Sequence, residues 1–232
     1  MKPFKLVVFD LDGVLVDSTE VMKIALKKSF DHAVGQGEAN FAEFKKYLGR
    51  SLPKIFEIMN LPKSMVDLYV RESYANSDMT RIYAGIHSVL NELRQLGVRT
   101  SIATGKSGER ARWLLKKINL NRYFDYVLGS DEVPAPKPDP SMLYQNMTYF
   151  DVSEKEMLFI GDAIADILCS KAAGVPFAAA MWGSDIPLQM MSNAPEYCLF
   201  FPEEIIQIVG GMHEYTVDAE WTEFRNTRKT PV

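Results

Sequence analysis

Cysteine and histidine are scarce in this chain of 232 residues, which contains two cysteines and three histidines. Cys169 and Cys198 are too few for the disulfide framework of a small secreted domain, so a reducing compartment is expected and we predict the cytoplasm. The apolar run near the N-terminus is broken early by the carboxylate of Asp10, which is not the pattern of a signal peptide.

Long apolar runs and an excess of positive charge are also missing. Nothing approaches the roughly 18 consecutive apolar residues of a membrane-spanning helix, so no membrane partner is predicted. The formal net charge is −4, which gives no overall positive field for a nucleic-acid backbone. These absences favour a soluble globular protein, for which we predict a monomer or a homodimer.

What the chain does have is an alternation of short apolar runs and helical segments. Six runs have the length and composition of buried strands: residues 5–10, 98–104, 126–129, 157–162, 177–182 and 197–200. Between two of them, Ala111, Leu114, Leu115 and Ile118 are spaced as one face of a helix. Continuous apolar strands separated by helices are typical of a parallel sheet covered on both faces. The sequence therefore predicts a doubly wound, Rossmann-like α/β core.

One interval of roughly sixty residues after the first run interrupts the alternation, and it is far longer than an ordinary connection between strands. It contains no strand-like run, and helical stripes recur along it, one of them through Phe41, Phe44, Tyr47 and Leu48. We therefore predict an inserted all-helical cap. The expected boundaries are residues 19–82 for the cap, 1–18 and 83–212 for the core, and 213–232 for a polar C-terminal tail.

Carboxylates follow two of the predicted strands. Asp10 and Asp12 end the first run, and Asp162 and Asp166 stand four positions apart at the start of a helix. The carboxyl ends of parallel strands meet at one edge of the sheet, where ligands bind. Carboxylates that converge there repel one another unless a cation neutralises them, and an oxygen-only ligand set suits Mg²⁺. A single aspartate at such a position is more often a cap or turn residue, so the magnesium prediction depends on convergence.

Donors for a phosphate group are expected at the same edge. Thr104 provides a hydroxyl, Gly105 lets the backbone approach closely, and the helix that follows directs free N–H groups at an anion. Lys106 and Lys137 offer positive charge, and prolines on both sides of Lys137 stiffen its turn. The Thr-Gly-Lys string alone also fits the plain start of a helix. We expect Thr104, Gly105 and Lys106 to bind substrate, with one of the two lysines pairing with the carboxylates.

Four motifs resemble those of the haloacid dehalogenase-like hydrolases. The first is the string Asp10-Leu11-Asp12-Gly13-Val14-Leu15-Val16-Asp17-Ser18, and the others are Thr104, Lys137 and Gly161-Asp162-Ala163-Ile164-Ala165-Asp166. The match covers about residues 4 to 200 and looks like the branch with phosphoglycolate phosphatases and β-phosphoglucomutases. Residues 47–50, 103–111 and 129–134 also resemble phosphatases associated with 3-amino-5-hydroxybenzoate synthesis, which implies sugar phosphates as further candidate substrates.

The resemblance implies a role for each motif residue. Asp10 would be the nucleophile that forms an aspartyl-phosphate, and Asp12 would protonate the leaving oxygen and then deprotonate the hydrolytic water. Thr104 and Lys137 would bind the phosphoryl group and stabilise its charge. True dehalogenases lack the second aspartate of the first motif, so Asp12 favours phosphoester chemistry.

The same resemblance implies the metal ligands. Asp162, Asp10 and the main-chain carbonyl of Asp12 would hold Mg²⁺, and Asp166 would be a further ligand or would support one. Ala163 departs from the family pattern, which often has serine there. The change removes a hydroxyl and no metal ligand, so the metal prediction is unaffected.

The insert has the size and place of a cap that closes over the site and contacts the leaving group. Arg50, in the turn Gly49-Arg50-Ser51, is the candidate for substrate contact, although an exposed arginine after a helix-ending glycine is also an ordinary surface feature. Arg110 and Arg112 fit a solvated helix face.

The resulting prediction is a Mg²⁺-dependent phosphatase of a small phosphorylated metabolite, with two alternatives. A phosphomutase would use the same residues but would shield the phosphoenzyme from water, and no feature of the cap indicates such shielding. A non-enzymatic, receiver-like module also gathers carboxylates with threonine and lysine, but it is about half as long and has no insert.

Overall fold

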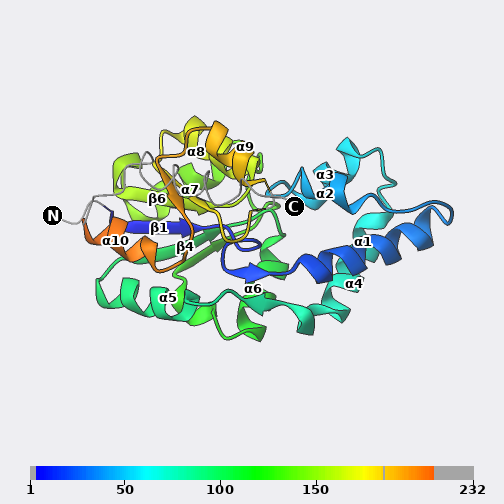
Figure 1. Ribbon diagram of the computed structural model, residues 1–232, viewed down its shortest axis with the longest axis horizontal. Coiled ribbons are helices and arrows are strands. Elements are labelled where there is room, and N and C mark those ends of the chain that lie inside the picture. The colour runs from blue at the N-terminus through cyan, green and yellow to red at the C-terminus, as the bar shows by residue number, and fades with distance from the viewer. Residues whose placement is uncertain (1–3, 185, 212–232) are drawn as a thin grey trace, which may run out of the picture.

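Six parallel strands form the central sheet of the protein, which is presented here as a computed structural model covering residues 4–184 and 186–211 (Figure 1). The strands are β1 (Leu6–Phe9), β4 (Arg99–Ala103), β5 (Tyr126–Leu128), β6 (Met157–Gly161), β7 (Phe177–Ala180) and β8 (Tyr197–Leu199), and their order is β5-β4-β1-β6-β7-β8. This is the order of a doubly wound nucleotide-binding fold, in which the winding direction reverses at the first strand. The predicted fold class is confirmed.

The register of β1 with its neighbours aligns the ends of three strands. Phe9 lies opposite Ile102 of β4 and Ile160 of β6. Asp10 comes one residue after this level, and Thr104 and Asp162 come two residues after it. Polar side chains that are far apart in the chain therefore share the carboxyl edge of the sheet, where the winding reverses.

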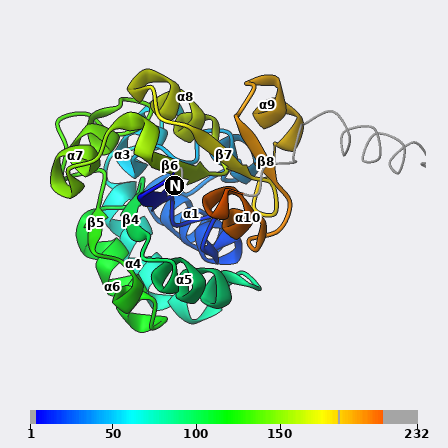
Figure 2. The ribbon, with the colours of Figure 1, turned by 90° about the vertical axis from the view of Figure 1, so that its left-hand side faces the viewer.

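Helices cover both faces of the sheet (Figure 2). One face packs against α5 (Ile86–Gln95), α6 (Gly108–Lys117) and α10 (Glu204–Gly210), and the other against α7 (Ser141–Phe150), α8 (Ile164–Ala173) and α9 (Pro187–Ser192). Along β1, Val7 and Phe9 point to the first set of helices, and Leu6 and Val8 to the second. Burial on both sides explains why the strands are continuous apolar runs.

The inserted cap has a hydrophobic core of its own, separate from the two cores that flank the sheet. Its helices are α1 (Thr19–Ala33), α2 (Phe41–Lys45), α3 (Leu52–Ile58) and α4 (Met65–Ala75). Helix α1 packs along α4, and Phe44, Phe56 and Tyr69 form an aromatic cluster between the helices.

The helix predicted to continue through Leu48 ends earlier. Helix α2 stops at Lys45, and the next residues form tighter turns in which the N–H groups of Lys46, Tyr47 and Leu48 donate to carbonyls three residues back. The chain then bends at Gly49, which has a φ of +83°, a backbone conformation that side chains disfavour. The prediction was wrong because Tyr47 and Leu48 continue the apolar stripe in a turn whose side chains pack against the cap's own hydrophobic core.

A small antiparallel ribbon connects the cap to the core. Strand β2 (Val16–Asp17) pairs with β3 (Arg81–Ile82), with Val16 opposite Ile82. No strand was expected within the insert at residues 19–82, so β3 corrects that expectation. Three 3₁₀ helices also lie within the described residues: η1 (Ser77–Met79), η2 (Asn121–Tyr123) and η3 (Glu154–Glu156).

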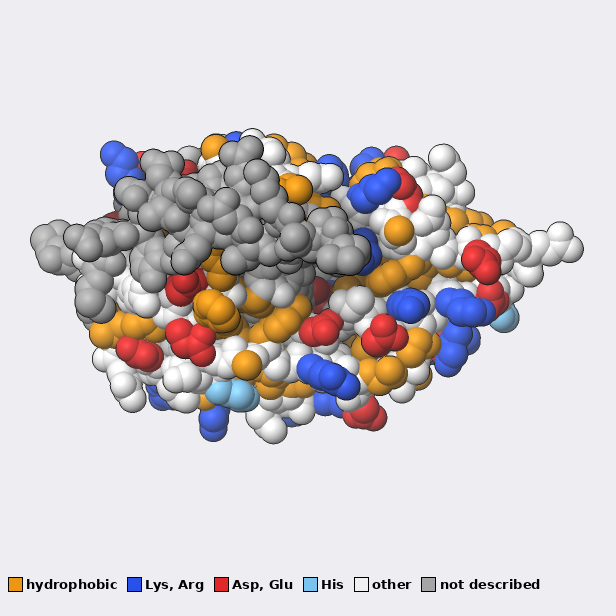
Figure 3. All heavy atoms as spheres, in the orientation of Figure 1, with side chains coloured by type: hydrophobic (Ala, Val, Ile, Leu, Met, Phe, Trp, Pro, Cys, Tyr) orange, Lys and Arg blue, Asp and Glu red, His pale blue; other side chains and the backbone are white. Residues whose placement is uncertain are grey.

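The surface carries charges of both signs. Figure 3 shows Lys and Arg side chains interspersed with Asp and Glu over the visible face. Cys169 and Cys198 are both free thiols. Within residues 4–184 and 186–211, each helix is too short or too polar to cross a membrane. The tail predicted over residues 213–232 lies outside the described residues.

Candidate active site

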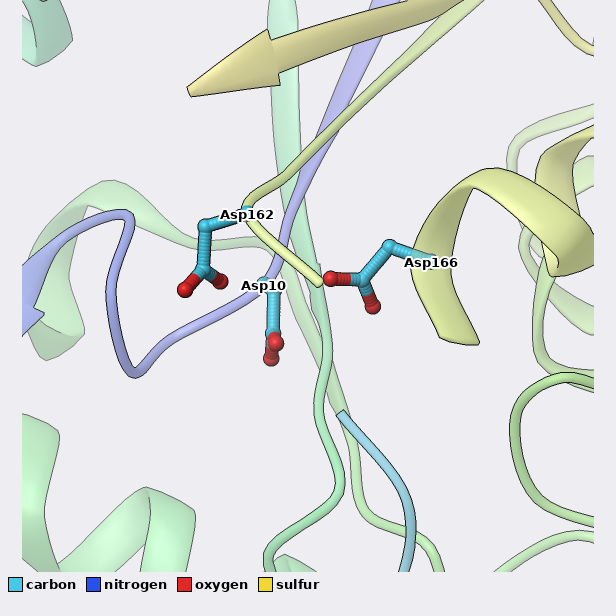
Figure 4. Close-up of side chains that lie close together, drawn as sticks. All are labelled: Asp10, Asp162 and Asp166. Atoms are coloured by element: carbon cyan, nitrogen blue, oxygen red, sulfur yellow. The ribbon is translucent and has the colours of Figure 1, made fainter. Parts of the chain in front are cut away.

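Three buried carboxylates converge at the carboxyl edge of the sheet. Oxygen atoms of Asp10, Asp162 and Asp166 all lie within 4.8 Å of one another. In Figure 4, Asp10 and Asp162 extend from neighbouring strand ends, while Asp166 reaches in from the first turn of α8. Asp162 was expected on that helix, but the helix begins at Ile164 and Asp162 belongs to the preceding turn.

Lys137 is the cation of this cluster. Its side chain is completely buried, and Nζ lies 2.6 Å from Oδ1 of Asp166 and 3.2 Å from Oδ2 of Asp10. The ammonium also donates to the carbonyl of Ala103 at 3.0 Å. Burial alone would lower the pKa of Lys137, but the charges of Asp10 and Asp166 outweigh it and raise the pKa above its ordinary value. The lysine therefore stays charged although it is out of contact with water.

One lysine does not neutralise three carboxylates. Burial raises the pKa of Asp10 to about 7 despite the opposing charge of Lys137, and the negative charge of Asp166 adds to the rise. Burial, Asp166 and Asp10 together hold the pKa of Asp162 well above its usual range. Clustered carboxylate oxygens with an excess of negative charge, free of nitrogen or sulfur ligands, fit a hard divalent cation. The residues present are therefore suited to Mg²⁺.

Asp12 lies apart from this cluster and has partners of its own. Its carboxylate accepts a hydrogen bond from the hydroxyl of Ser18 and forms an ion pair with Lys106. Burial would raise the pKa of Asp12, but Lys106 and Ser18 more than compensate, and the pKa is lower than usual. Each of the two predicted lysines thus pairs with a carboxylate: Lys137 with Asp10 and Asp166, and Lys106 with Asp12. Metal contact by the main-chain carbonyl of Asp12 stays a prediction.

The oxygens of Asp166 are already engaged within the protein. Oδ1 contacts Lys137, and Oδ2 accepts a hydrogen bond from the backbone N–H of Ala163 at 3.0 Å. This arrangement fixes the start of α8 and places Lys137 beside Asp10. Of the two roles expected for Asp166, the geometry favours support of the other site residues.

A cavity opens between the carboxyl edge of the sheet and the cap. Its core wall contains Asp10, Asp12, Thr104, Gly105, Lys106 and Asp162, and its cap wall contains Met22, Phe44, Leu48, Arg50, Leu52, Ile55 and Tyr69. The predicted residues Thr104, Gly105, Lys106 and Arg50 thus border one space. Gly183 also lines the cavity, whereas the indole N–H of neighbouring Trp182 donates to the carbonyl of Val14.

The cap turn touches the core at Gly105. A Cβ atom built on Gly105 would lie 2.4 Å from the carbonyl oxygen of Arg50 and 2.9 Å from that of Gly49. These distances are shorter than van der Waals contact, so only glycine fits without movement of one backbone or the other. The close approach seats Arg50 over the phosphate-binding turn predicted from the sequence.

Arg110 is a cavity residue that the sequence analysis placed on a solvated helix face. It stands in the first turn of α6 and is half-buried, its guanidinium donates to the hydroxyl of Ser73 at 3.0 Å, and it lies 5.9 Å from the ring centre of Tyr69. Arg112 does lie on the outside, paired with Glu132 at 2.7 Å. The position of Arg110 in the sequence could have indicated a cavity residue, because the first turn of a helix that follows a strand lies at the binding edge of the sheet.

The comparisons with known proteins agree with this geometry. Residues 7–180 match the model of a family described as haloacid dehalogenase-like hydrolase. The chain belongs to this family. It is 30% identical over 191 residues to the phosphoglycolate phosphatase of Pseudomonas syringae pv. tomato, covering 77% of this chain and 70% of that protein. It is also 31% identical over 203 residues to phosphoglycolate phosphatase 1 of Pseudomonas aeruginosa, covering 82% and 74% respectively.

Solved structures share the fold of this family member. One is described as a predicted phosphoglycolate phosphatase from Haemophilus somnus, with a TM-score of 0.79 and 21% identity over 90% of this chain and 99% of that one. Another is described as a predicted phosphatase from Clostridium acetobutylicum, with a TM-score of 0.78 and 22% identity over the same shares. The family match and the relatives together identify the protein as a phosphatase, which confirms the prediction from the sequence.

Proposed function

We propose that the protein hydrolyses a small phosphomonoester through an aspartyl-phosphate on Asp10, with Mg²⁺ held by Asp10, Asp162 and the carbonyl of Asp12. The observation that carries this proposal is the position of Asp10. Its carboxylate lies at the strand end where the winding reverses, beside Asp162 and the buried Lys137, and it borders the cavity. It is therefore placed to attack a phosphorus atom that enters from the cap side.

In the first step, a carboxylate oxygen of Asp10 forms a bond to phosphorus while the bond from phosphorus to the leaving oxygen breaks. The hydroxyl of Thr104 and the ammonium of Lys137 stabilise the charge that spreads over the phosphoryl oxygens. Mg²⁺ supplies further positive charge to these oxygens when it is bound.

The proton for the leaving oxygen comes from Asp12. Without substrate its pKa is held low by Lys106, which favours the ionised form. A phosphate that enters beside Lys106 competes for this ammonium, and loss of the pairing raises the pKa of Asp12 toward the protonated state. Substrate binding thus prepares the acid. In the second step Asp12 deprotonates a water that attacks phosphorus, and release of phosphate regenerates Asp10.

One candidate substrate is phosphoglycolate, because the relatives described above are named phosphoglycolate phosphatases. Sugar phosphates are the other candidates, because three short segments of the sequence resemble phosphatases that act on them. The apolar side chains of the cap wall exclude water from the reacting centre and shape the space for the leaving group. A phosphomutase would return the phosphoryl group to another hydroxyl, so phosphate release measured beside isomer formation on hexose phosphates separates the two activities.

Turnover of p-nitrophenyl phosphate tests the proposal. We expect activity with Mg²⁺, its loss in EDTA, and recovery when Mg²⁺ is restored. Asp10→Asn should lower kcat by at least about 10³-fold, because it removes the nucleophile, and the other catalytic residues act only together with it. Asp125→Asn is the matched control, since Asp125 pairs with Arg99 on the surface. Acid quenching with a substrate radiolabelled on its phosphoryl group should trap label on the wild type and on Asp125→Asn, but not on Asp10→Asn. Full activity in EDTA, or in Asp10→Asn, would contradict the mechanism.

A further inference from the structure

Three cationic side chains line the cavity, and they differ in their partners. Lys106 forms an ion pair with Asp12. Arg50 and Arg110 have no carboxylate at salt-bridge distance among the residues that the structure describes, and the charge of Arg110 acts on Asp12 only at longer range. A half-buried cation without a paired carboxylate is unfavourable in the free protein, and an anionic ligand reduces this cost. An unneutralised arginine on a cavity wall therefore points to a negative group on the molecule that fills the cavity.

Arg110 is held in place by neutral groups. Its guanidinium donates to Ser73 Oγ at 3.0 Å and faces the ring of Tyr69 at 5.9 Å, and both residues belong to α4 of the cap. A hydroxyl and an aromatic face orient a guanidinium without cancelling its charge. The planar group remains able to bind a carboxylate or phosphate with two parallel hydrogen bonds.

Arg110 also stands where the cavity continues between cap and core. A second hollow lies between α1, α4 and α6, and it shares Ser18, Met22, Tyr69, Lys106 and Arg110 with the reaction cavity. The rest of its lining consists of hydroxyl-bearing side chains of the insert together with Val21, Trp113 and Leu114. A leaving group that extends away from Asp10 into this hollow passes the guanidinium of Arg110.

We propose that Arg110 is a specificity-determining residue whose guanidinium binds a second anionic group, a carboxylate or a phosphate, on the leaving group of the substrate. The inference rests on the phosphatase reaction proposed above and adds the class of substrate. The transferred phosphoryl group has its own donors in Thr104 and Lys137, so the charge of Arg110 is available for the other end of the molecule.

Three substrates of similar size test the assignment: ethyl phosphate, phosphoglycolate and 1,2-ethanediol bisphosphate. Their leaving groups are neutral, carboxylate-bearing and phosphate-bearing. We expect the wild type to prefer at least one anionic leaving group over ethyl phosphate by about tenfold or more in kcat/KM, and the preferred one identifies the anion. Arg110→Gln should reduce this preference about ten- to hundredfold, and Arg110→Lys should retain part of it because it keeps the charge but loses the planar fork.

Two further variants are controls for position and charge. Arg112→Gln removes an arginine two residues along the same helix that is paired with Glu132 on the outer surface, so the preference should stay at the wild-type value. Arg50→Gln removes the other unpaired cation of the cavity. If the preference disappears in Arg50→Gln and persists in Arg110→Gln, the assignment of Arg110 is overturned. A wild type that hydrolyses all three substrates without preference overturns it as well.

A binding measurement separates this inference from the proposed reaction. Titration calorimetry compares 3-phosphonopropionate with propylphosphonate, which are non-hydrolysable and differ in the carboxylate. A pair of propane-1,3-diphosphonate and propylphosphonate does the same for a second phosphate. Tighter binding of either compound with two anionic ends, lost in Arg110→Gln, supports the assignment of Arg110 whether or not a phosphomonoester is hydrolysed. A lack of any phosphomonoester hydrolysis would refute the proposed phosphatase mechanism and not this assignment. Equal binding of all three compounds would overturn the role of Arg110.

Discussion

The two walls of the cavity are built from opposite kinds of side chain. The core wall presents carboxylates, Lys106 and a threonine at the ends of hydrogen-bonded parallel strands, Lys137 is buried behind it, and each lysine contacts a carboxylate. The cap wall is mainly apolar, with Phe44, Leu52 and Ile55 buried in the cap's own core. The contrast indicates that the core carries the chemistry and that the cap sets the shape and dryness of the space. Substitutions on the two walls should therefore change different kinetic constants.

Among the variants that compare the two walls, the largest effect is expected behind the core wall, from Lys137→Met. This change removes a lysine that contacts both Asp10 and Asp166, so kcat/KM should fall by roughly 10²–10³-fold. The free energy of unfolding should also fall by about 3 kcal/mol, because two buried carboxylates lose their partner. Kinetics on p-nitrophenyl phosphate and urea unfolding measure the two losses. Lys116→Met, on the exposed side of α6, is the control, and a similar rate in both variants would remove Lys137 from the mechanism.

The electrostatics of the core wall also predict how metal binding depends on pH. Because the pKa of Asp10 is raised to about 7 in the metal-free protein, a cation must displace a proton from it at lower pH. The apparent affinity for Mg²⁺ should fall by at least about tenfold for each pH unit below 7, because Asp10 must lose a proton and the raised pKa of Asp162 adds to the same trend. Calorimetric titrations between about pH 5.5 and 8.5 would show this slope. An affinity that is constant across that range would mean that Asp10 binds no metal.

The contact between the walls can be tested at one atom. In Gly105→Ala, the new methyl group meets the carbonyl oxygens of Arg50 and Gly49, so the cap turn must move away from the core. We expect kcat/KM to fall about tenfold, because small displacements of positioning groups are costly. A Cβ on Gly210 meets nothing within 4 Å, which makes Gly210→Ala the matched control. Wild-type kinetics in Gly105→Ala would show that the seated turn is not needed for turnover.

The smallest effect is expected on the cap wall. Leu48→Ala removes part of a half-buried apolar side chain from the cavity, and KM for a substrate with an apolar leaving group should rise about three- to tenfold. The change in kcat should be smaller, since Leu48 is on the wall opposite the carboxylates. Leu188→Ala is a control on an exposed leucine of α9, 63% accessible to solvent. A larger change in kcat than in KM would break the division of labour between the walls.

Much of the fold is predictable from the sequence because parallel strands buried on both faces leave a continuous apolar signal. Val8, Ile102 and Ile160 belong to three such runs, and all three are fully buried in adjacent strands. The polar residues that follow these runs meet because parallel strands end at the same edge. Asp10 and Asp162 could therefore be predicted as neighbours without knowledge of the strand order.

Contacts between cap and core could not be predicted in the same way. Arg110 turns inward because Ser73 and Tyr69 of α4 pack against its guanidinium, and this depends on how two separately folded parts meet. The partner of each lysine could not be predicted either, because it depends on how the loops of the core fold at the edge of the sheet. Lys106 is nearer in sequence to the phosphate-binding turn, yet its ammonium is taken by Asp12, and Lys137 reaches the acidic cluster from a more distant loop.

The ribbon of β2 and β3 has a consequence for how such an enzyme diversifies. The chain leaves the core at Asp17 and comes back at Arg81, and these residues are directly paired. For the sheet, the intervening helices are equivalent to a long hairpin loop, and loops whose ends are adjacent tolerate wholesale replacement. Evolution can thus replace the cap, which selects the substrate, without changing the residues at the sheet edge that cleave it.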